Sequence, residues 1–286
     1  MEFTDDSFTK LIRESKPLPK NTFRFRYQAG GHGIHNNKIG FITDYQCKNV
    51  YKYSKKLPKS IREIEFYADL LENKFKLNSP EIIILLKDFI PKYIGIFYQE
   101  STQSLFLGLE NFLRLMKNPN VCDIKIGKIS YAPDAKEEKI LAQKLKYIYR
   151  EDIKFMITGI LMYNITDDSY NHIGTNKTRN FTPDNILENG FAPFFDKSLF
   201  TDYKKNKAIV LDYFLSKIDN LLTWFHNQND LQFISSSVIM AHEDTGDNVN
   251  LEFRLVDFTH WIHAKENKDE NMIEGLESLR EYLKRV

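Results

Sequence analysis

The sequence predicts an α+β protein of two lobes, in which a small antiparallel β-rich N-terminal lobe precedes a larger mixed α/β lobe. Two observations predict this class. From Phe23 to Tyr53, aromatic and polar residues alternate around Gly30, Gly31 and Gly33, a pattern typical of strands joined by a tight turn. Beyond residue 110, helical periodicity is interleaved with short apolar runs. The 286 residues, 42% of them hydrophobic, suffice for a sizeable core.

The N-terminal lobe is expected to span residues 1–110. Its first strands lead to Ser60 and Glu63, which have the spacing of a capping box, and apolar residues follow at helical positions. We therefore predict a helix over residues 60–75. The apolar run at 104–109 predicts a short buried strand, after which the lobe ends.

The second lobe is expected to cover residues 111–286 and to contain more helix than the first. A period of 3.6 residues predicts helices over 152–163, 208–227 and 271–285. Alternation of apolar and polar residues predicts strands over 232–240 and 250–258.

Composition argues against several classes of function. The 40 Lys and Arg residues are balanced by 39 Asp and Glu, a formal net charge of +1, so no global basic field exists to hold nucleic acid or a membrane surface. Cys47 and Cys122 lack the companions of a disulfide framework or a zinc site. Lys87 and Asp88 end the most apolar run, and the acidic N-terminus does not resemble a signal peptide. We expect a monomer without a membrane span, located in the cytoplasm and also in the nucleus.

Residues 123–127, Asp-Ile-Lys-Ile-Gly, are the first candidates for chemistry. In a strand, alternation places Asp123, Lys125 and Gly127 on one face while the isoleucines point into a core. Phosphoryl transfer requires a fixed cation near the moving phosphoryl group and a carboxylate near the nucleotide or the acceptor. An ion pair on the surface of a strand would produce the same pattern, so this run alone leaves both interpretations open.

Asp257 ends a second apolar strand, which is the setting in which kinases hold Mg²⁺ against ATP phosphates. Upstream, Lys52 lies in an aromatic strand pattern and Glu63 lies in the following helix, the order of the ion pair between a strand lysine and a helix glutamate in protein kinases. The chain has no HRDxxxxN loop, no GxGxxGxV loop and no APE triplet, which argues against a protein kinase.

Residues 134–150 are expected to form one helix with a cationic face. At about 100° per residue, the polar side chains that share a sector of roughly 80° are Lys136, Lys139, Gln143, Lys146 and Arg150. The side chains expected to be buried on the opposite face are Leu141, Leu145 and Ile148. A solvated helix face would show the same stripe. Next to Asp123 and Lys125, however, it suits a densely phosphorylated acceptor, because each phosphate needs several charge-assisted hydrogen bonds.

A known signature matches residues 119–127. Pro119, Asp123, Lys125 and Gly127 fill the fixed positions of PxxxDxKxG, and the chain thereby resembles the inositol polyphosphate kinase family. Further matches are QAGGH at 28–32, REIEFY at 62–67, PKY at 91–93, LEN at 109–111, SSS at 235–237 and VDFTH at 256–260. The resemblance implies a two-lobed protein-kinase-like architecture, related to ATP-grasp and SAICAR-synthase folds.

The resemblance also implies ATP and Mg²⁺ as cofactors. Lys52 would contact the ATP phosphates, while Glu110 and the backbone of Phe112 would hold adenine. Asp123 would bind the nucleotide at its ribose, and Asp257 would coordinate Mg²⁺ and act with Lys125 in catalysis.

The acceptor would be an inositol polyphosphate, with Lys125 stabilising the transferred phosphoryl group. Positions similar to the family's inositol phosphate contacts are Lys59, Lys139, Gln143, Lys146 and His260. Lys128 and Arg150 are added to this set from their charge alone.

Within the family, Gly30-Gly31-His32, Leu109-Glu110-Asn111 and the triple serine resemble the hexakisphosphate kinases more than the multikinases. The expected reaction is therefore transfer of the ATP γ-phosphoryl group to inositol hexakisphosphate, which gives diphosphoinositol pentakisphosphate. A multikinase that acts on lower inositol phosphates is the alternative within the family. A non-catalytic inositol phosphate sensor is the alternative of another class.

Overall fold

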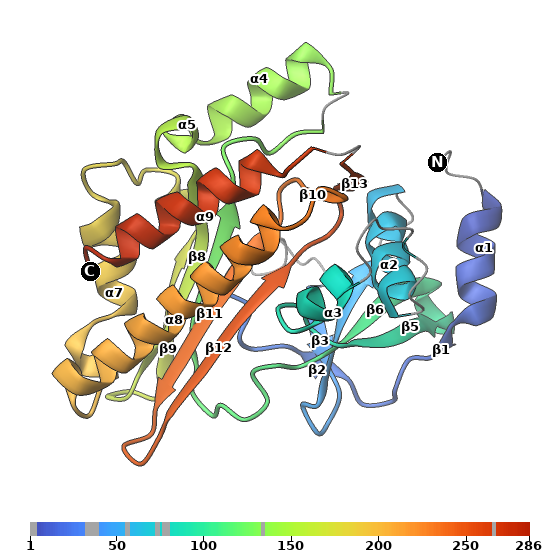
Figure 1. The fold of residues 1–286 in the computed structure, drawn as a ribbon. Helices are drawn as coiled ribbons and strands as arrows, with labels where there is room; N and C mark the ends of the chain where they lie inside the picture. Colours follow the sequence, from blue (N-terminus) through green and yellow to red (C-terminus); the bar gives the residue numbers. More distant parts are fainter. Residues whose placement is uncertain are drawn as a thin grey trace.

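The computed structural model describes residues 5–31, 40–54, 58–71, 75, 81–132, 135–264 and 267–286. These residues form two lobes, each built on its own β-sheet (Figure 1). The chain passes from the first sheet to the second between Glu110 and Asn120. The predicted α+β class and two-lobed architecture are confirmed.

The sheet of the N-terminal lobe has the strand order β1-β5-β6-β4-β3-β2. Its strands are β1 (Lys16–Pro17), β2 (Phe23–Arg24), β3 (Phe41–Thr43), β4 (Asn49–Ser54), β5 (Tyr93–Gln99) and β6 (Ser104–Glu110). The neighbouring strands are antiparallel except for the short β1, which runs parallel to β5. The α-helices among the described residues of this lobe are α1 (Asp5–Glu14), α2 (Pro58–Leu71) and α3 (Glu81–Lys87).

The larger lobe contains an antiparallel sheet of order β12-β11-β7-β8-β9 and a small pair, β10-β13. Its strands are β7 (Asn120–Ile126), β8 (Phe155–Asn164), β9 (Ser169–Gly174), β10 (Leu231–Phe233), β11 (Ser237–Asp244), β12 (Val249–Val256) and β13 (Trp261–His263). Its α-helices are α4 (Glu137–Lys146), α5 (Arg150–Ile153), α6 (Thr175–Thr178), α7 (Ala192–Phe194), α8 (Tyr203–His226) and α9 (Glu270–Leu283).

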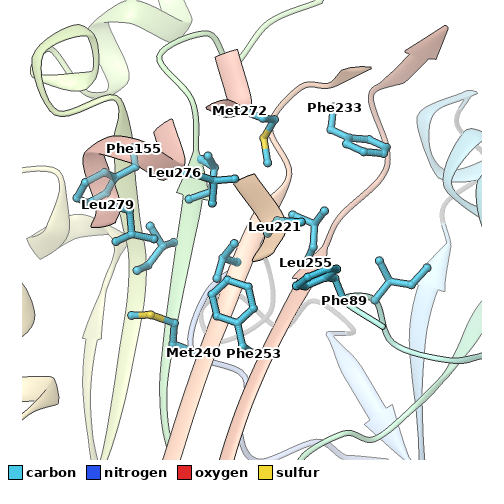
Figure 2. Packing of buried hydrophobic residues seen from close by; sticks show 14 of the residues in the cluster. Phe89, Phe155, Leu221, Phe233, Met240, Phe253, Leu255, Met272, Leu276 and Leu279 are labelled. Atoms are coloured by element: carbon cyan, nitrogen blue, oxygen red, sulfur yellow. The ribbon is translucent and has the colours of Figure 1, made fainter. Parts of the chain in front are cut away.

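The core of the larger lobe lies between its sheet and the neighbouring helices α8 and α9 (Figure 1). Buried side chains of α8 recur at helical spacing, as in Val210, Phe214 and Ile218, so one stripe of the helix is covered. Figure 2 shows Leu276 and Leu279 of α9 beside strand residues of this core. The core continues towards the N-terminal lobe, where the amide of Leu255 donates a 2.7 Å hydrogen bond to the carbonyl of Phe89.

The helix predicted over residues 152–163 is wrong, because residues 155–163 lie in strand β8 and only residues 152–153 are helical, at the end of α5. The strand lies between β7 and β9, and its Phe155, Ile157 and Ile160 are buried. A strand that is buried on both faces lacks alternation of apolar and polar residues, so its pattern cannot be distinguished from that of a buried helix.

Three other boundaries differ from the predictions. Helix α2 begins at Pro58 and ends at Leu71, so Ser60 lies inside its first turn and the predicted capping box is wrong. The predicted strand 232–240 is divided into β10 and β11 around Ser235, whose φ of 66° breaks an extended chain. The helix predicted over 134–150 is divided into α4 and α5, and residues 133–134 lie outside the described part.

The remaining predicted elements are confirmed, with ends that differ by a few residues. The predicted strands 104–109 and 250–258 correspond to β6 and β12, and the predicted helices 208–227 and 271–285 correspond to α8 and α9. The strands expected between Phe23 and Tyr53 are β2, β3 and β4, while Gly33 lies outside the described residues. In the described part of the chain, no helix has the length and apolarity needed to cross a membrane.

Candidate active site

Lys52 of β4 and Glu63 of α2 form an ion pair on the side of the N-terminal lobe that meets the larger lobe. Lys52 Nζ donates a 2.8 Å hydrogen bond to Glu63 Oε1, and the glutamate is only 3% exposed. The same ammonium lies 3.6 Å from Asp257 Oδ1. Burial opposes the charge of Lys52, but the carboxylates of Asp257 and Glu63 outweigh it and raise the pKa of the lysine. The cation is therefore fixed between an acid of each lobe.

Asp257 directly follows β12 and has a φ of 68°, in the left-handed region that non-glycine residues rarely occupy. Its Oδ1 accepts a 3.0 Å hydrogen bond from the hydroxyl of Thr259. Burial alone would raise the pKa of Asp257, but Lys52 and Lys125 overcome it and lower the pKa to about 2. The carboxylate is thus ionised at neutral pH, as a ligand of a divalent cation must be.

Asp123 and Lys125 lie on β7 with two buried isoleucines between and after them, as the alternation predicted. Lys125 pairs with Ser237 in the ladder between β7 and β11. Burial lowers the pKa of Lys125, although Asp257 opposes this shift. A lysine with little solvent and a nearby acid can present its charge to a phosphoryl group at small reorganisation cost.

The carboxylate of Asp123 is enclosed by the glycine segment of the N-terminal lobe. A Cβ at Gly30 would overlap Asp123 Oδ2, and a Cβ at Gly159 would overlap the carbonyl of Ala29. The other oxygen, Oδ1, is buried and has no hydrogen-bond partner among the described residues. Burial raises the pKa of Asp123. A buried acceptor of this kind requires a donor, which a ligand hydroxyl group would supply.

The connection between the lobes is held by backbone and side-chain hydrogen bonds. The amide of Glu110 donates to the carbonyl of Lys92 at 2.8 Å, and the amide of Asn111 donates to the carbonyl of Lys48 at 2.9 Å. The carboxylate of Glu110 lies 3.7 Å from the guanidinium of Arg114. The ring of Phe112 lies 5.8 Å from the guanidinium of Arg254. This segment therefore has a defined shape at the place predicted to hold adenine.

The turn after β7 is clamped by residues that the sequence analysis did not predict for this role. Gly127 has a φ of 90°, and a Cβ there would overlap the side chain of Asn271. Asn271 Oδ1 accepts from the amide of Ile129 at 2.8 Å, and its Nδ2 donates to the carbonyl of Ile129 at 3.2 Å. A single asparagine at the start of a helix has no local pattern that would reveal this contact.

Arg150 was predicted to lie on the cationic stripe, and this placement is wrong. The helix breaks after α4, and Arg150 begins α5 with only 6% of its surface exposed. Its Nε donates a 2.9 Å hydrogen bond to the carbonyl of Gly127, and burial lowers its pKa to about 10. Arg150 thus supports the turn behind Lys125, and its contact with an acceptor stays a prediction.

The other polar residues of the predicted cationic face lie on or beside helix α4, whose apolar side is not buried. Lys139 and Lys146 are exposed and Gln143 is half-buried. The side chains predicted to be buried are instead exposed by 59%, 67% and 64%, at Leu141, Leu145 and Ile148 respectively. This prediction is wrong because no described element packs against the apolar side of α4.

The other predicted acceptor contacts lie at different places around the site. Lys128 pairs with Glu274 at 2.9 Å and lines a surface cavity of about 460 Å³. The carbonyl of His260 accepts a 3.1 Å hydrogen bond from the amide of Ile234. The side chain of Lys59 lies outside the described residues. Their acceptor contacts stay predictions.

Comparison with known proteins shows to which family this chain belongs. A family model described as inositol polyphosphate kinase matches residues 106–284. The chain belongs to the inositol polyphosphate kinase family. The match includes Asp123, Lys125 and Asp257, and excludes the strand that carries Lys52.

Individual members of the inositol polyphosphate kinase family are similar to this chain over different lengths. Human inositol polyphosphate multikinase is 31% identical over 223 residues, which cover 76% of this chain and 50% of that protein. Mouse inositol hexakisphosphate kinase 3 is 26% identical over 207 residues, or 64% of this chain and 51% of that protein. The chain therefore spans about half the length of these two relatives.

A solved structure confirms the fold. The inositol phosphate multikinase of S. cerevisiae, in a crystal with ADP and Mn²⁺, matches with a TM-score of 0.67 at 22% identity. The match covers 83% of this chain and 98% of the yeast chain.

Proposed function

We propose that this protein is an ATP-dependent inositol polyphosphate kinase of the multikinase type, which phosphorylates lower inositol phosphates. The observation that carries this proposal is the ionised carboxylate of Asp257, which lies 3.6 Å from the ammonium of Lys52 and whose pKa is lowered by the charges of Lys52 and Lys125. Phosphoryl transfer depends on positioning and on stabilisation of charge, and these residues supply both.

The described residues fit a nucleotide with a divalent cation. Asp257 is ionised and lies beside Lys52. The carboxylate would hold Mg²⁺, and the ammonium of Lys52 would contact the ATP phosphates. Bound Mg²⁺ would neutralise part of the phosphate charge. The unpartnered Oδ1 of Asp123 would accept a hydrogen bond from a ribose hydroxyl group. Glu110 and the backbone of Phe112 would bind adenine at the connection between the lobes. The ADP and Mn²⁺ of the yeast structure support the use of a nucleotide and a divalent cation.

Lys125 would stabilise the phosphoryl group as it moves to the acceptor hydroxyl. Its position on β7 is fixed by pairing with both β11 and β8 and by the clamped turn that follows. The exposed Lys139 and Lys146 would bind phosphates of the acceptor, while Arg150 would act through the turn.

The choice of acceptor differs from the expectation in the sequence analysis. The human multikinase is the more similar of the two mammalian relatives, in both identity and coverage of this chain. This similarity favours lower inositol phosphates over the hexakisphosphate. The short motifs that resemble hexakisphosphate kinases, such as the triple serine, do not include the predicted acceptor contacts of α4.

The decisive experiment incubates the purified protein with Mg-ATP and separately with inositol trisphosphate, tetrakisphosphate and hexakisphosphate, and then separates the products by charge. We expect phosphorylation of the lower inositol phosphates. Formation of a pyrophosphorylated product from the hexakisphosphate alone would restore the first expectation. A protein that is stabilised by inositol phosphates in a thermal-shift assay, but neither turns over nor responds to Mg-ATP, would be a sensor.

A further inference from the structure

The peptide unit between Asp257 and Phe258 is held from both lobes. Its carbonyl oxygen accepts a 2.8 Å hydrogen bond from the hydroxyl of Ser236. Its N–H donates a 3.3 Å hydrogen bond to Glu63 Oε1, the same oxygen that binds Lys52. Because both polar groups of this peptide are bound, its plane is fixed, and the side chain of Asp257 leaves the backbone in a defined direction.

This support is needed because the backbone conformation of Asp257 is unfavourable. Its φ of 68° is left-handed, and such residues persist only where the surroundings hold them. In a relaxed extended conformation, the carboxylate would no longer point towards Lys52. The hydroxyl of Ser236 is well placed to hold this turn, since the residue is only 1% exposed.

Ser236 also connects the turn to the strand that carries Lys125. Its carbonyl oxygen accepts a 3.0 Å hydrogen bond from the amide of Ile126. The next residue, Ser237, pairs with both Lys125 and Val256. One serine therefore links the end of β7 to Asp257, and we propose that Ser236 is a positioning residue that aims the carboxylate of Asp257 at the divalent cation. This inference rests on the proposed function.

The neighbouring serine provides a matched control. Ser235 is also buried, and its hydroxyl donates a 3.0 Å hydrogen bond to a carbonyl, but this carbonyl belongs to Ser130 in the loop after Gly127. Ser235→Ala and Ser236→Ala thus remove the same chemical group and the same kind of hydrogen bond. They differ in whether that bond reaches Asp257.

The test measures ADP binding by calorimetry with and without Mg²⁺, and does not require an acceptor. In the wild type, we expect Mg²⁺ to increase ADP affinity. Ser236→Ala should reduce this Mg²⁺-dependent gain by about 10- to 100-fold, the usual effect of removing a group that orients a metal ligand. ADP affinity without metal should stay within about twofold, because an orienting role does not affect the base or the ribose. Ser235→Ala should keep the full gain.

Three results would overturn the proposal: an unchanged Mg²⁺ gain in Ser236→Ala, an equal loss of ADP affinity with and without metal, or the same loss in Ser235→Ala. If Ser236→Ala does not fold, Ser236→Cys decides, because a thiol is a weaker donor of similar size. A partial loss of the gain in Ser236→Cys supports the proposal, and a full gain contradicts it. A wild-type protein that binds no ADP would instead refute the proposed function, and this outcome is visible before any variant is measured.

Discussion

Lys52 and Asp257 face each other across the two lobes, with Nζ of the lysine 3.6 Å from Oδ1 of the aspartate. Glu63 connects them a second time, because its Oε1 binds both the lysine ammonium and the amide that follows Asp257. The charge of the site therefore depends on the packing of one lobe against the other. A change in any of the three residues should alter both nucleotide chemistry and stability.

Lys52→Ala should reduce turnover by about 100-fold or more, since it removes a cation from the predicted phosphate site. It should also lower the free energy of unfolding by about 1–3 kcal/mol, because Glu63 then stays buried without its partner. Steady-state kinetics and urea unfolding measure the two effects. Lys10→Ala, which removes an exposed pair with Glu14, is the control and should change stability by less than about 0.5 kcal/mol. Equal stability of both variants would contradict the prediction.

Lys125→Ala should strongly reduce turnover while sparing nucleotide binding. The lysine is predicted to contact the moving phosphoryl group, whereas Glu110, Phe112 and Asp123 are predicted to hold adenine and the ribose. We expect kcat to fall by about 100- to 1000-fold, as when a charge-stabilising group is removed. ADP affinity, measured by calorimetry, should change by less than about threefold. A large loss of ADP affinity would place Lys125 at the nucleotide instead of the moving phosphoryl group.

Gly159→Ala should disturb the glycine segment over Asp123, because the new Cβ would overlap the carbonyl of Ala29. The backbone cannot yield as easily as a flexible side chain, so we expect a loss of about 1–3 kcal/mol in unfolding free energy and weaker ADP binding. Asn171→Ala, at an exposed position of the neighbouring strand β9, is the control and should leave both quantities nearly unchanged. If the two variants lose equal stability, the contact between residue 159 and the carbonyl of Ala29 is not the reason why a glycine is required there.

His242 should contribute a loss of stability in mild acid. It is fully buried beside Phe194, whose carbonyl lies 2.8 Å from Nε2, and burial lowers its pKa to about 4. At this residue the unfolded chain binds a proton near pH 6.5 and the folded protein does not, so the contribution of His242 to stability is complete above about pH 6.5 and is lost as the pH drops towards 4. The expected loss from His242 alone between pH 7.5 and pH 5 is about 2 kcal/mol, while Asp269, whose pKa burial raises to about 6, contributes in the opposite direction.

Urea unfolding at several pH values tests this expectation. His242→Phe should be less stable at pH 7.5 but should lose this part of the pH dependence. The exposed His226, changed to Gln, should leave the dependence intact. The same slope in His242→Phe as in the wild type would assign the effect to other groups.

The residues predicted from local pattern and those revealed only by the structure differ in a physical way. Asp123 and Lys125 could be predicted because alternation along a strand reports which face each side chain takes. The contacts of Ser236 and Asn271 join segments far apart in the sequence, and no local pattern contains them. Arg150 was misplaced because the prediction treated residues 134–150 as one unbroken helix, whereas helix α4 ends at Lys146.

Helix α4 carries lysines on one face and exposed leucines on another, so the effects of charge and of apolar contact on acceptor binding can be tested separately. Lys139 and Lys146 are exposed on the face predicted to bind the acceptor, while Leu141 and Leu145 are exposed elsewhere on the same helix. Lys146→Ala should raise KM for the acceptor by about 5- to 10-fold with kcat nearly unchanged, because the loss of one phosphate contact acts on binding. Combining it with Lys139→Ala should raise KM further. Leu145→Ser on the apolar face is the control and should leave KM within about twofold, since Leu145 is 67% exposed. If Leu145→Ser raises KM as much as Lys146→Ala, the acceptor contacts the apolar face, and the predicted orientation of α4 towards the acceptor is wrong.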